Sequence, residues 1–91
     1  MQSLKIAIDS MLRKFGIENA IAQNNALNIW SEIVGEKVAK HTEPDRVEHG
    51  IMIIKVSSPT WRQELYFQKT EIIKKINNKI GRNVIRDIRF I

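Results

Sequence analysis

The sequence predicts an α+β fold in which helices pack on one face of a small three-stranded sheet, in the order α-α-β-β-α-β. Apolar residues recur with helical spacing over the first forty residues and again after Pro59. Short extended runs lie between these segments and at the C-terminal end. Because 91 residues without cysteine can bury only a small core, we expect residues 1–91 to form a single domain.

The first predicted helix covers residues 3–15. Its apolar face is formed by Leu4, Ile8, Met11 and Phe15. Ser3 is placed to cap its N-terminus. Gly16 follows the last apolar position directly, so we expect it to end the helix.

A second helical segment runs from about Glu18 to Lys40. Its apolar stripe is formed by Leu27, Trp30, Val34 and Val38. Asn24 and Asn25 weaken the middle, so the segment is either two helices or one helix with a break. Gly35 costs about 1 kcal/mol relative to alanine inside a helix, so it marks either a kink or the close approach of another backbone.

A β-hairpin follows the helical segments. Pro44 disfavours helix, and His49-Gly50 separates two extended runs, Asp45–Glu48 and Ile51–Val56. Gly50 supplies the positive φ of a tight turn. Both faces of the Ile51–Val56 run are apolar, so we expect a central strand covered on both sides.

The longest helix is predicted for residues 59–80. Ser58 is placed as its N-cap, Pro59 as its first residue, and Gly81 as its end. Its core face is formed by Trp61, Leu65, Ile72, Ile76 and Ile80. We interpret Trp61 as a core residue that packs this helix against the sheet, whereas Arg62 beside it faces outward.

The final run, residues 83–91, predicts a strand with Ile88 and Phe90 toward the core. Because it returns after a long helix, it can pair in parallel with an earlier strand. This arrangement resembles a type II K-homology (KH) module. The resemblance is one of architecture, because no two of the four glycines have the spacing of the KH GxxG loop.

Positive charge is concentrated in the C-terminal part. Residues 1–54 carry six Lys/Arg against seven Asp/Glu, a net charge of −1, and residues 55–91 carry nine against three, a net charge of +6. Such asymmetry favours a polyanion, and nucleic acid first. The predicted nucleic-acid contacts are Arg62, Lys74, Lys75, Lys79, Arg82, Arg86 and Arg89. The alternative is a basic surface with no such partner.

The aromatic residues divide into two groups. Trp30 lies on the apolar stripe of its helix and is predicted to be in the core. Tyr66 and Phe67 lie off the main isoleucine face, so they either cover a second flank of the core or are exposed for a partner. We assign Tyr66, Phe67 and Lys69 as candidate partner-binding residues.

The sequence gives little support for catalysis, a metal or a cofactor. His41 and His49 are the two histidines, and neither has a motif-spaced acid. There is no phosphate-binding GxxxxGK[ST] or GxGxxG motif, so we expect no cofactor and no small-molecule substrate. The N-terminus does not read as a signal peptide, and no apolar run is long enough to cross a membrane. We therefore expect a cytoplasmic, nucleoid-associated protein without a membrane partner.

Three ordered stretches resemble the bacterial DciA family. They are IWSEIVGEKVAKHTEP (29–44), HGIMIIKVSSPTWRQELYFQK (49–69) and IGRNVIRDIRFI (80–91). The motif positions within them include Trp30, Gly35, Gly50, Trp61 and Leu65. The match covers nearly the whole chain, and its specificity comes from the ordered set and its spacings.

The resemblance implies a KH-like fold and a non-enzymatic role in DNA replication. Members of the family bind DNA, single-stranded or duplex, and load or operate the DnaB-type replicative helicase. Many carry a long disordered extension, whereas this sequence ends at Ile91 after the last predicted strand, so we expect no such C-terminal tail. The alternative is a general DNA- or RNA-binding KH-like module, such as a ribosome- or RNA-associated one, without a helicase role.

Overall fold

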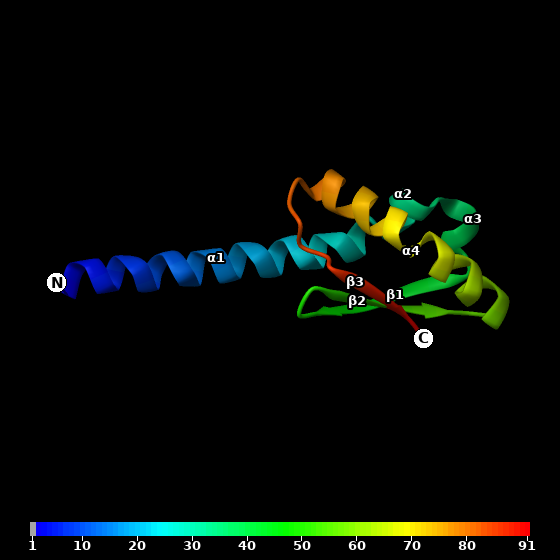
Figure 1. The fold of residues 1–91 in the computed structure, drawn as a ribbon, viewed down its shortest axis with the longest axis horizontal. Helices are drawn as coiled ribbons and strands as arrows, with labels where there is room; N and C mark the ends of the chain where they lie inside the picture. Colours follow the sequence, from blue (N-terminus) through cyan, green and yellow to red (C-terminus); the bar gives the residue numbers. More distant parts are fainter. Residues whose placement is uncertain (1) are drawn as a thin grey trace.

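The structure, a computed structural model, describes the backbone of residues 2–91 and the side chains from Ala7 onward. The predicted apolar residue Leu4 therefore lies outside the described side chains. Helices lie on one side of a three-stranded sheet, as predicted (Figure 1). The elements are α1 (Gln2–Asn28), α2 (Trp30–Val34), α3 (Glu36–Ala39), β1 (Thr42–Glu48), β2 (Ile51–Val56), α4 (Pro59–Ile80) and β3 (Asp87–Phe90).

Helix α1 is one continuous helix of 27 residues. The predicted cap, Ser3, lies inside it, and the predicted end, Gly16, lies in its middle, so both predictions are wrong. A glycine weakens a helix by only about 1 kcal/mol relative to alanine. Ala22 and Ala26 follow Gly16 and are buried in the domain core. Their packing stabilises the part of the helix that follows Gly16, and the cost of one glycine is too small to end the helix by itself.

The second predicted segment is broken at Ile29 and at Gly35 rather than at the two asparagines. Gly35 has φ 87° and ψ 162°, a conformation that is essentially restricted to glycine, and no atom lies within 4 Å of the position of a Cβ there. The chain is therefore kinked at Gly35.

Trp30 is 1% exposed, and its Nε1 donates a hydrogen bond of 2.8 Å to Thr42 Oγ1. The Thr42 hydroxyl in turn donates to the carbonyl oxygen of Val38.

Strands β1 and β2 form the predicted hairpin. His49 and Gly50 have φ 52° and 80°, the pair of positive values of a type I′ turn. Strand β1 starts three residues earlier than predicted and includes Pro44, which an edge strand tolerates. The register shifts between Pro44 and Arg46, at a β-bulge.

Strand β2 is central, with Met52 and Ile54 buried against the helices and Ile53 buried on the other face. This confirms the prediction of a central strand, whereas the expected cover on both sides is not found, because the helices lie on one face of the sheet only. Strand β3 pairs in parallel with β2, and Ile88 and Phe90 are level with Met52 and Ile54 on the core side. β3 is thus an edge strand whose free side runs beside α4.

Helix α4 has the predicted ends. The Ser58 side chain accepts a hydrogen bond from the backbone N–H of Trp61, and Gly81 ends the helix with φ 88°. Asn77 is buried near this end, and its amide oxygen accepts hydrogen bonds from the N–H groups of Val84 and Ile85. Its amide nitrogen donates to the carbonyl oxygen of Ile85. Asn77 thereby fixes the turn that leads into β3.

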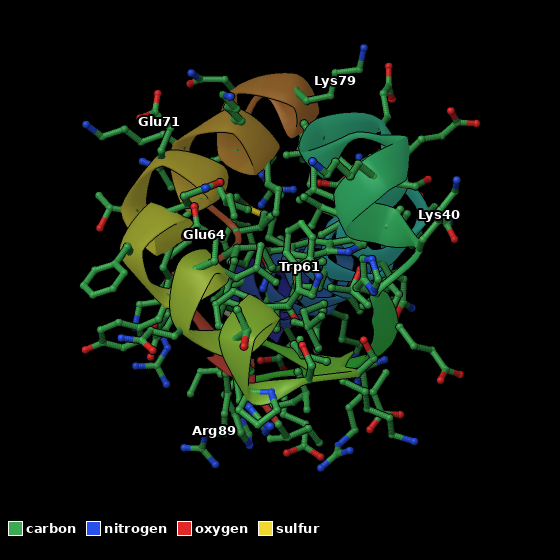
Figure 2. The ribbon with its side chains drawn as sticks, turned by 90° about the vertical axis from the view of Figure 1, so that its right-hand side faces the viewer. Lys40, Trp61, Glu64, Glu71, Lys79 and Arg89 are labelled. Carbon is green, nitrogen blue, oxygen red and sulfur yellow. The ribbon has the colours of Figure 1, made fainter. Side chains whose placement is uncertain are left out.

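Trp61 differs from its prediction. It is half-buried and lies outside the main core cluster. Its ring stacks on that of His41 with 4.8 Å between ring centroids (Figure 2, where Trp61 lies between the start of α4 and the α3–β1 corner). Trp61 is in the first turn of α4, level with the end of β2, so the sheet no longer extends beneath it. The fully buried side chains are Trp30, Met52, Ile54, Leu65 and Ile76.

Candidate nucleic-acid interface

A groove of about 520 Å³ lies between the first half of α4 and the edge strand β3. It brings together Arg62, Tyr66 and Lys69 from α4 with Arg89 from β3. The rest of its lining is Pro59, Gln63, Asp87, Ile88 and Phe90. Four residues predicted to bind nucleic acid or a partner thus share one concave surface.

The spacing of these residues explains why they meet. Arg62, Tyr66 and Lys69 follow one another at i, i+4 and i+7, so they form one stripe on α4. Arg89 is paired in register with Ile53, so its side chain belongs to the sheet face that the helices leave open. Figure 2 shows Arg89 pointing away from the helical layer. The α4 stripe and the open face meet along β3.

An ion pair crosses the groove. The ammonium nitrogen of Lys69 lies 3.1 Å from a carboxylate oxygen of Asp87 and 4.9 Å from the centre of the Tyr66 ring. Partial burial of the Asp87 carboxyl opposes its ionisation. The hydrogen bond from Lys69, one from the backbone of Ile88 and the charge of Arg89 outweigh that burial, so the pKa of Asp87 is lowered.

This arrangement suits a phosphate backbone with a stacked base. Arg62 and Arg89 provide guanidinium groups, which donate paired hydrogen bonds to phosphate oxygens. The Tyr66 ring is 62% exposed and offers an aromatic surface beside them. Aromatic rings interleaved with cations are typical of single-stranded nucleic-acid sites.

Three other predicted cations lie on a different side of the molecule. Lys74 and Lys75 line a second groove, between α2 and α4, which also contains the 75%-exposed Phe67. The ammonium nitrogen of Lys79 lies 3.2 Å from a carboxylate oxygen of Glu32. In Figure 2, Lys79 and Arg89 lie at opposite ends of the view.

The last two predicted cations, Arg82 and Arg86, contact the middle of α1 and the hairpin turn, respectively. The Arg82 guanidinium lies 5.5 Å from the centre of the Phe15 ring, and Arg86 Nε donates a hydrogen bond of 2.8 Å to the carbonyl oxygen of His49. The seven predicted nucleic-acid residues therefore fall into three groups. Only Arg62 and Arg89 lie in the groove beside β3.

Two groove residues were assigned differently, or not at all, from the sequence. Lys69 was assigned to partner binding. Its spacing of seven residues from Arg62 indicates that both side chains lie on the same face of α4, and this signal could have grouped them. Asp87 was not assigned, and its alternation with Arg89 along β3 places both on one side of the strand. The parallel return of β3 was predicted, but the sequence does not show which side chains of α4 lie beside it, because that depends on how the helix packs along the sheet.

Neither a metal site nor a membrane span is found in the described part of the chain. Among its residues, no three His, Asp or Glu side chains are grouped so that they could hold a metal ion. None of its helices combines the length and the apolar character needed to cross a bilayer.

Comparisons with known proteins give one family. The family model described as "Dna[CI] antecedent, DciA" matches residues 3–90. A UPF0232 protein of Mycobacterium tuberculosis is 26% identical over 88 residues, which cover 97% of this chain and 47% of the relative. A UPF0232 protein of Corynebacterium glutamicum is 27% identical over 88 residues, 97% of this chain and 49% of the relative. The chain spans about half the length of the curated relatives that it matches.

Proposed function

Because the chain belongs to the DciA family, we propose that it is a non-enzymatic replication accessory protein that binds DNA and helps to load or operate the DnaB-type replicative helicase. The helicase role rests on family membership. DNA binding rests on the groove beside β3, where Arg62, Lys69 and Arg89 surround the exposed ring of Tyr66. This groove is the observation that carries the proposal.

The groove favours a single strand over a duplex. Its cations lie on both walls of a narrow concave surface, and its aromatic ring offers stacking that a paired base cannot use. Each phosphate neutralised by an arginine or lysine releases counterions, so binding should weaken steeply with salt. Arg62 and Arg89 are proposed to hold the backbone, and Tyr66 to stack on one base.

The first experiment locates the DNA surface. Fluorescence anisotropy with single-stranded DNA, duplex DNA and RNA, at two salt concentrations, compares Arg62→Glu/Arg89→Glu with Lys74→Glu/Lys75→Glu. The two variants change the net charge equally, but only the first changes the groove. We expect a loss of at least about tenfold, and a shallower salt dependence, for the groove variant. Equal losses of DNA affinity in both variants would show that the groove beside β3 is not the DNA-binding surface.

The second experiment tests the helicase role. The chain and its cognate replicative helicase are combined at low salt, and complex formation and helicase deposition on single-stranded DNA are measured. We expect a complex and more helicase on the DNA. A chain that binds DNA but neither binds nor stimulates the helicase would be a general nucleic-acid module, and the helicase part of the proposal would be wrong.

A further inference from the structure

The first two-thirds of α1 form an arm that extends beyond the domain (Figure 1). The molecule measures 58 Å along its longest axis and about 20 Å across the other two. Every side chain from Ala7 to Glu18 is exposed, whereas Ala22 and Ala26 are buried in the core. The arm meets the domain at Phe15, whose ring lies 5.5 Å from the Arg82 guanidinium, and at Gly16, which lines a cavity with residues of the hairpin turn.

One face of the arm is apolar. Ile8, Met11, Leu12 and Phe15 are 49%, 70%, 64% and 61% exposed. They follow one another at i, i+3, i+4 and i+7, which confines them to an arc of about 100°. Ala22 lies seven residues beyond Phe15 on the same arc, so this face is the outward continuation of the stripe that packs in the domain.

We propose that this face pairs with the same face of a second copy of the chain, with the two arms antiparallel. An isolated helix of this length is marginal in water, and helices in proteins owe most of their stability to a buried apolar face. When two arms pair, each helix buries its apolar face against the other. This proposal does not depend on the proposed function.

The spacing of the four apolar residues is self-complementary. It is symmetric about the midpoint between Met11 and Leu12. An antiparallel pair centred there places Ile8 of one copy opposite Phe15 of the other, and Met11 level with Leu12. Such an isologous contact is the commonest way in which identical chains associate.

The apolar area is sufficient for a weak dimer. The four side chains expose on the order of 500 Å² per copy, so pairing removes about 1,000 Å² from water, the lower limit of specific interfaces. We therefore expect a reversible dimer with a dissociation constant of roughly 10–100 μM.

Sedimentation equilibrium of the 91-residue chain from about 5 to 500 μM tests the association directly. We expect a monomer–dimer equilibrium that Met11→Glu weakens at least about tenfold, because the substitution places a charge in the seam. Ser10→Glu is the matched control, since it introduces the same residue one position away on the opposite side of the helix. Its dissociation constant should change less than about twofold.

Cysteine cross-linking tests the relative orientation of the two arms. Because the sequence contains no cysteine, only the introduced residues can form a disulfide. A mixture of Ile8→Cys and Phe15→Cys chains should cross-link, whereas Ile8→Cys alone should not. Cross-linking of Ile8→Cys to itself would indicate parallel arms and contradict the proposal.

Two further outcomes would overturn the proposal. A chain that stays monomeric at every concentration excludes the second copy as the partner. A helicase complex lost in Met11→Glu but kept in Ser10→Glu would then assign this face to the helicase. A dimer that Met11→Glu leaves unchanged must use another surface. The intensity and wavelength of the tryptophan fluorescence, from Trp30 and Trp61 together, check that the domain remains folded in each variant.

Discussion

The ammonium nitrogen of Lys69 lies 3.1 Å from a carboxylate oxygen of Asp87, across the groove between α4 and the edge strand β3. Asp87 is the one carboxylate in the lining of this groove, and the charges of Lys69 and Arg89 act on it. The pair joins α4 to β3. It also occupies Lys69, so the proposed DNA binding predicts that this contact stabilises the fold but lowers DNA affinity.

Asp87→Asn is predicted to strengthen DNA binding. It removes a negative charge from the groove and releases Lys69 to a phosphate. We expect about a three- to tenfold gain in affinity at low salt, with a steeper salt dependence. Anisotropy with single-stranded DNA measures it. Asp45→Asn, which removes a carboxylate paired with Arg46 on the opposite edge strand, is the control and should change affinity less. A loss of affinity in Asp87→Asn would show that Asp87 positions the groove.

The stability contributed by Asp87 should depend on pH. Its pKa is lower in the folded chain than the ordinary 3.8. Partial burial raises the pKa, but the hydrogen bonds from Lys69 and from the backbone of Ile88, together with the charges of Lys69 and Arg89, outweigh that burial. A lowered carboxyl pKa stabilises the fold above the unfolded-state pKa, and this contribution is lost as the pH falls through the folded-state value. The pair is half exposed, so the difference in unfolding free energy between wild type and Asp87→Asn should be below about 1 kcal/mol at pH 7. Urea denaturation should show that difference shrinking as the pH falls below 3.8 and vanishing once the pH is below the folded-state pKa, and a constant difference would contradict it.

The features predicted correctly from the sequence are those that local chemistry determines. The His49-Gly50 turn, the Ser58 cap and the Gly81 end each depend on a few adjacent residues, and all three are present. The parallel return of β3 was predictable from chain order. Gly16 failed as a helix end because distant packing at Ala22 and Ala26 outweighs a local weakness.

The cations were less predictable, because charge along a sequence does not show which residues face one another. Lys79 is held by Glu32 on α2, a contact between segments 47 residues apart. Arg82 lies over a ring of α1, and Arg89 joins Arg62 through β3. These neighbourhoods exist only once the helices and the sheet are assembled. Trp61 was assigned to the core from its helical face, but the sheet ends before it reaches that turn.

Gly50→Ala is predicted to destabilise the fold more than Gly81→Ala. Both glycines have φ near 80–90°, so both substitutions strain the backbone. A Cβ at Gly50 would also lie 3.3 Å from the carbonyl oxygen of Val84 and from Arg86 Cγ, whereas nothing lies within 4 Å at Gly81. We expect about 1 kcal/mol for Gly81→Ala and roughly 2–3 kcal/mol for Gly50→Ala by urea denaturation. Equal losses would show that the hairpin turn moves away from Val84 at little cost.

Thr42→Val is predicted to destabilise the fold by about 1–3 kcal/mol. It keeps the shape of the side chain but removes the oxygen that accepts from Trp30 Nε1, leaving a buried N–H without its partner. Trp30→Phe in the same background should lose less than Trp30→Phe in wild type, because the hydrogen bond is already absent. Thermal unfolding of wild type, of Thr42→Val, of Trp30→Phe and of the double variant gives the coupling free energy between the two residues. Additive losses would mean that the bond contributes nothing to stability.

Asn77 is predicted to matter for DNA binding although it lies outside the groove. Its side chain makes three hydrogen bonds to the backbone of Val84 and Ile85, three and two residues before β3. Asn77→Leu leaves these buried groups unpaired, so we expect a loss of about 3 kcal/mol in unfolding free energy. Because β3 carries Arg89, we also expect DNA affinity to fall severalfold under conditions where the variant stays folded. The exposed neighbour Asn78→Leu is the control and should change stability by less than about 0.5 kcal/mol. A destabilised but folded Asn77→Leu that binds DNA as wild type does would show that this turn does not position Arg89.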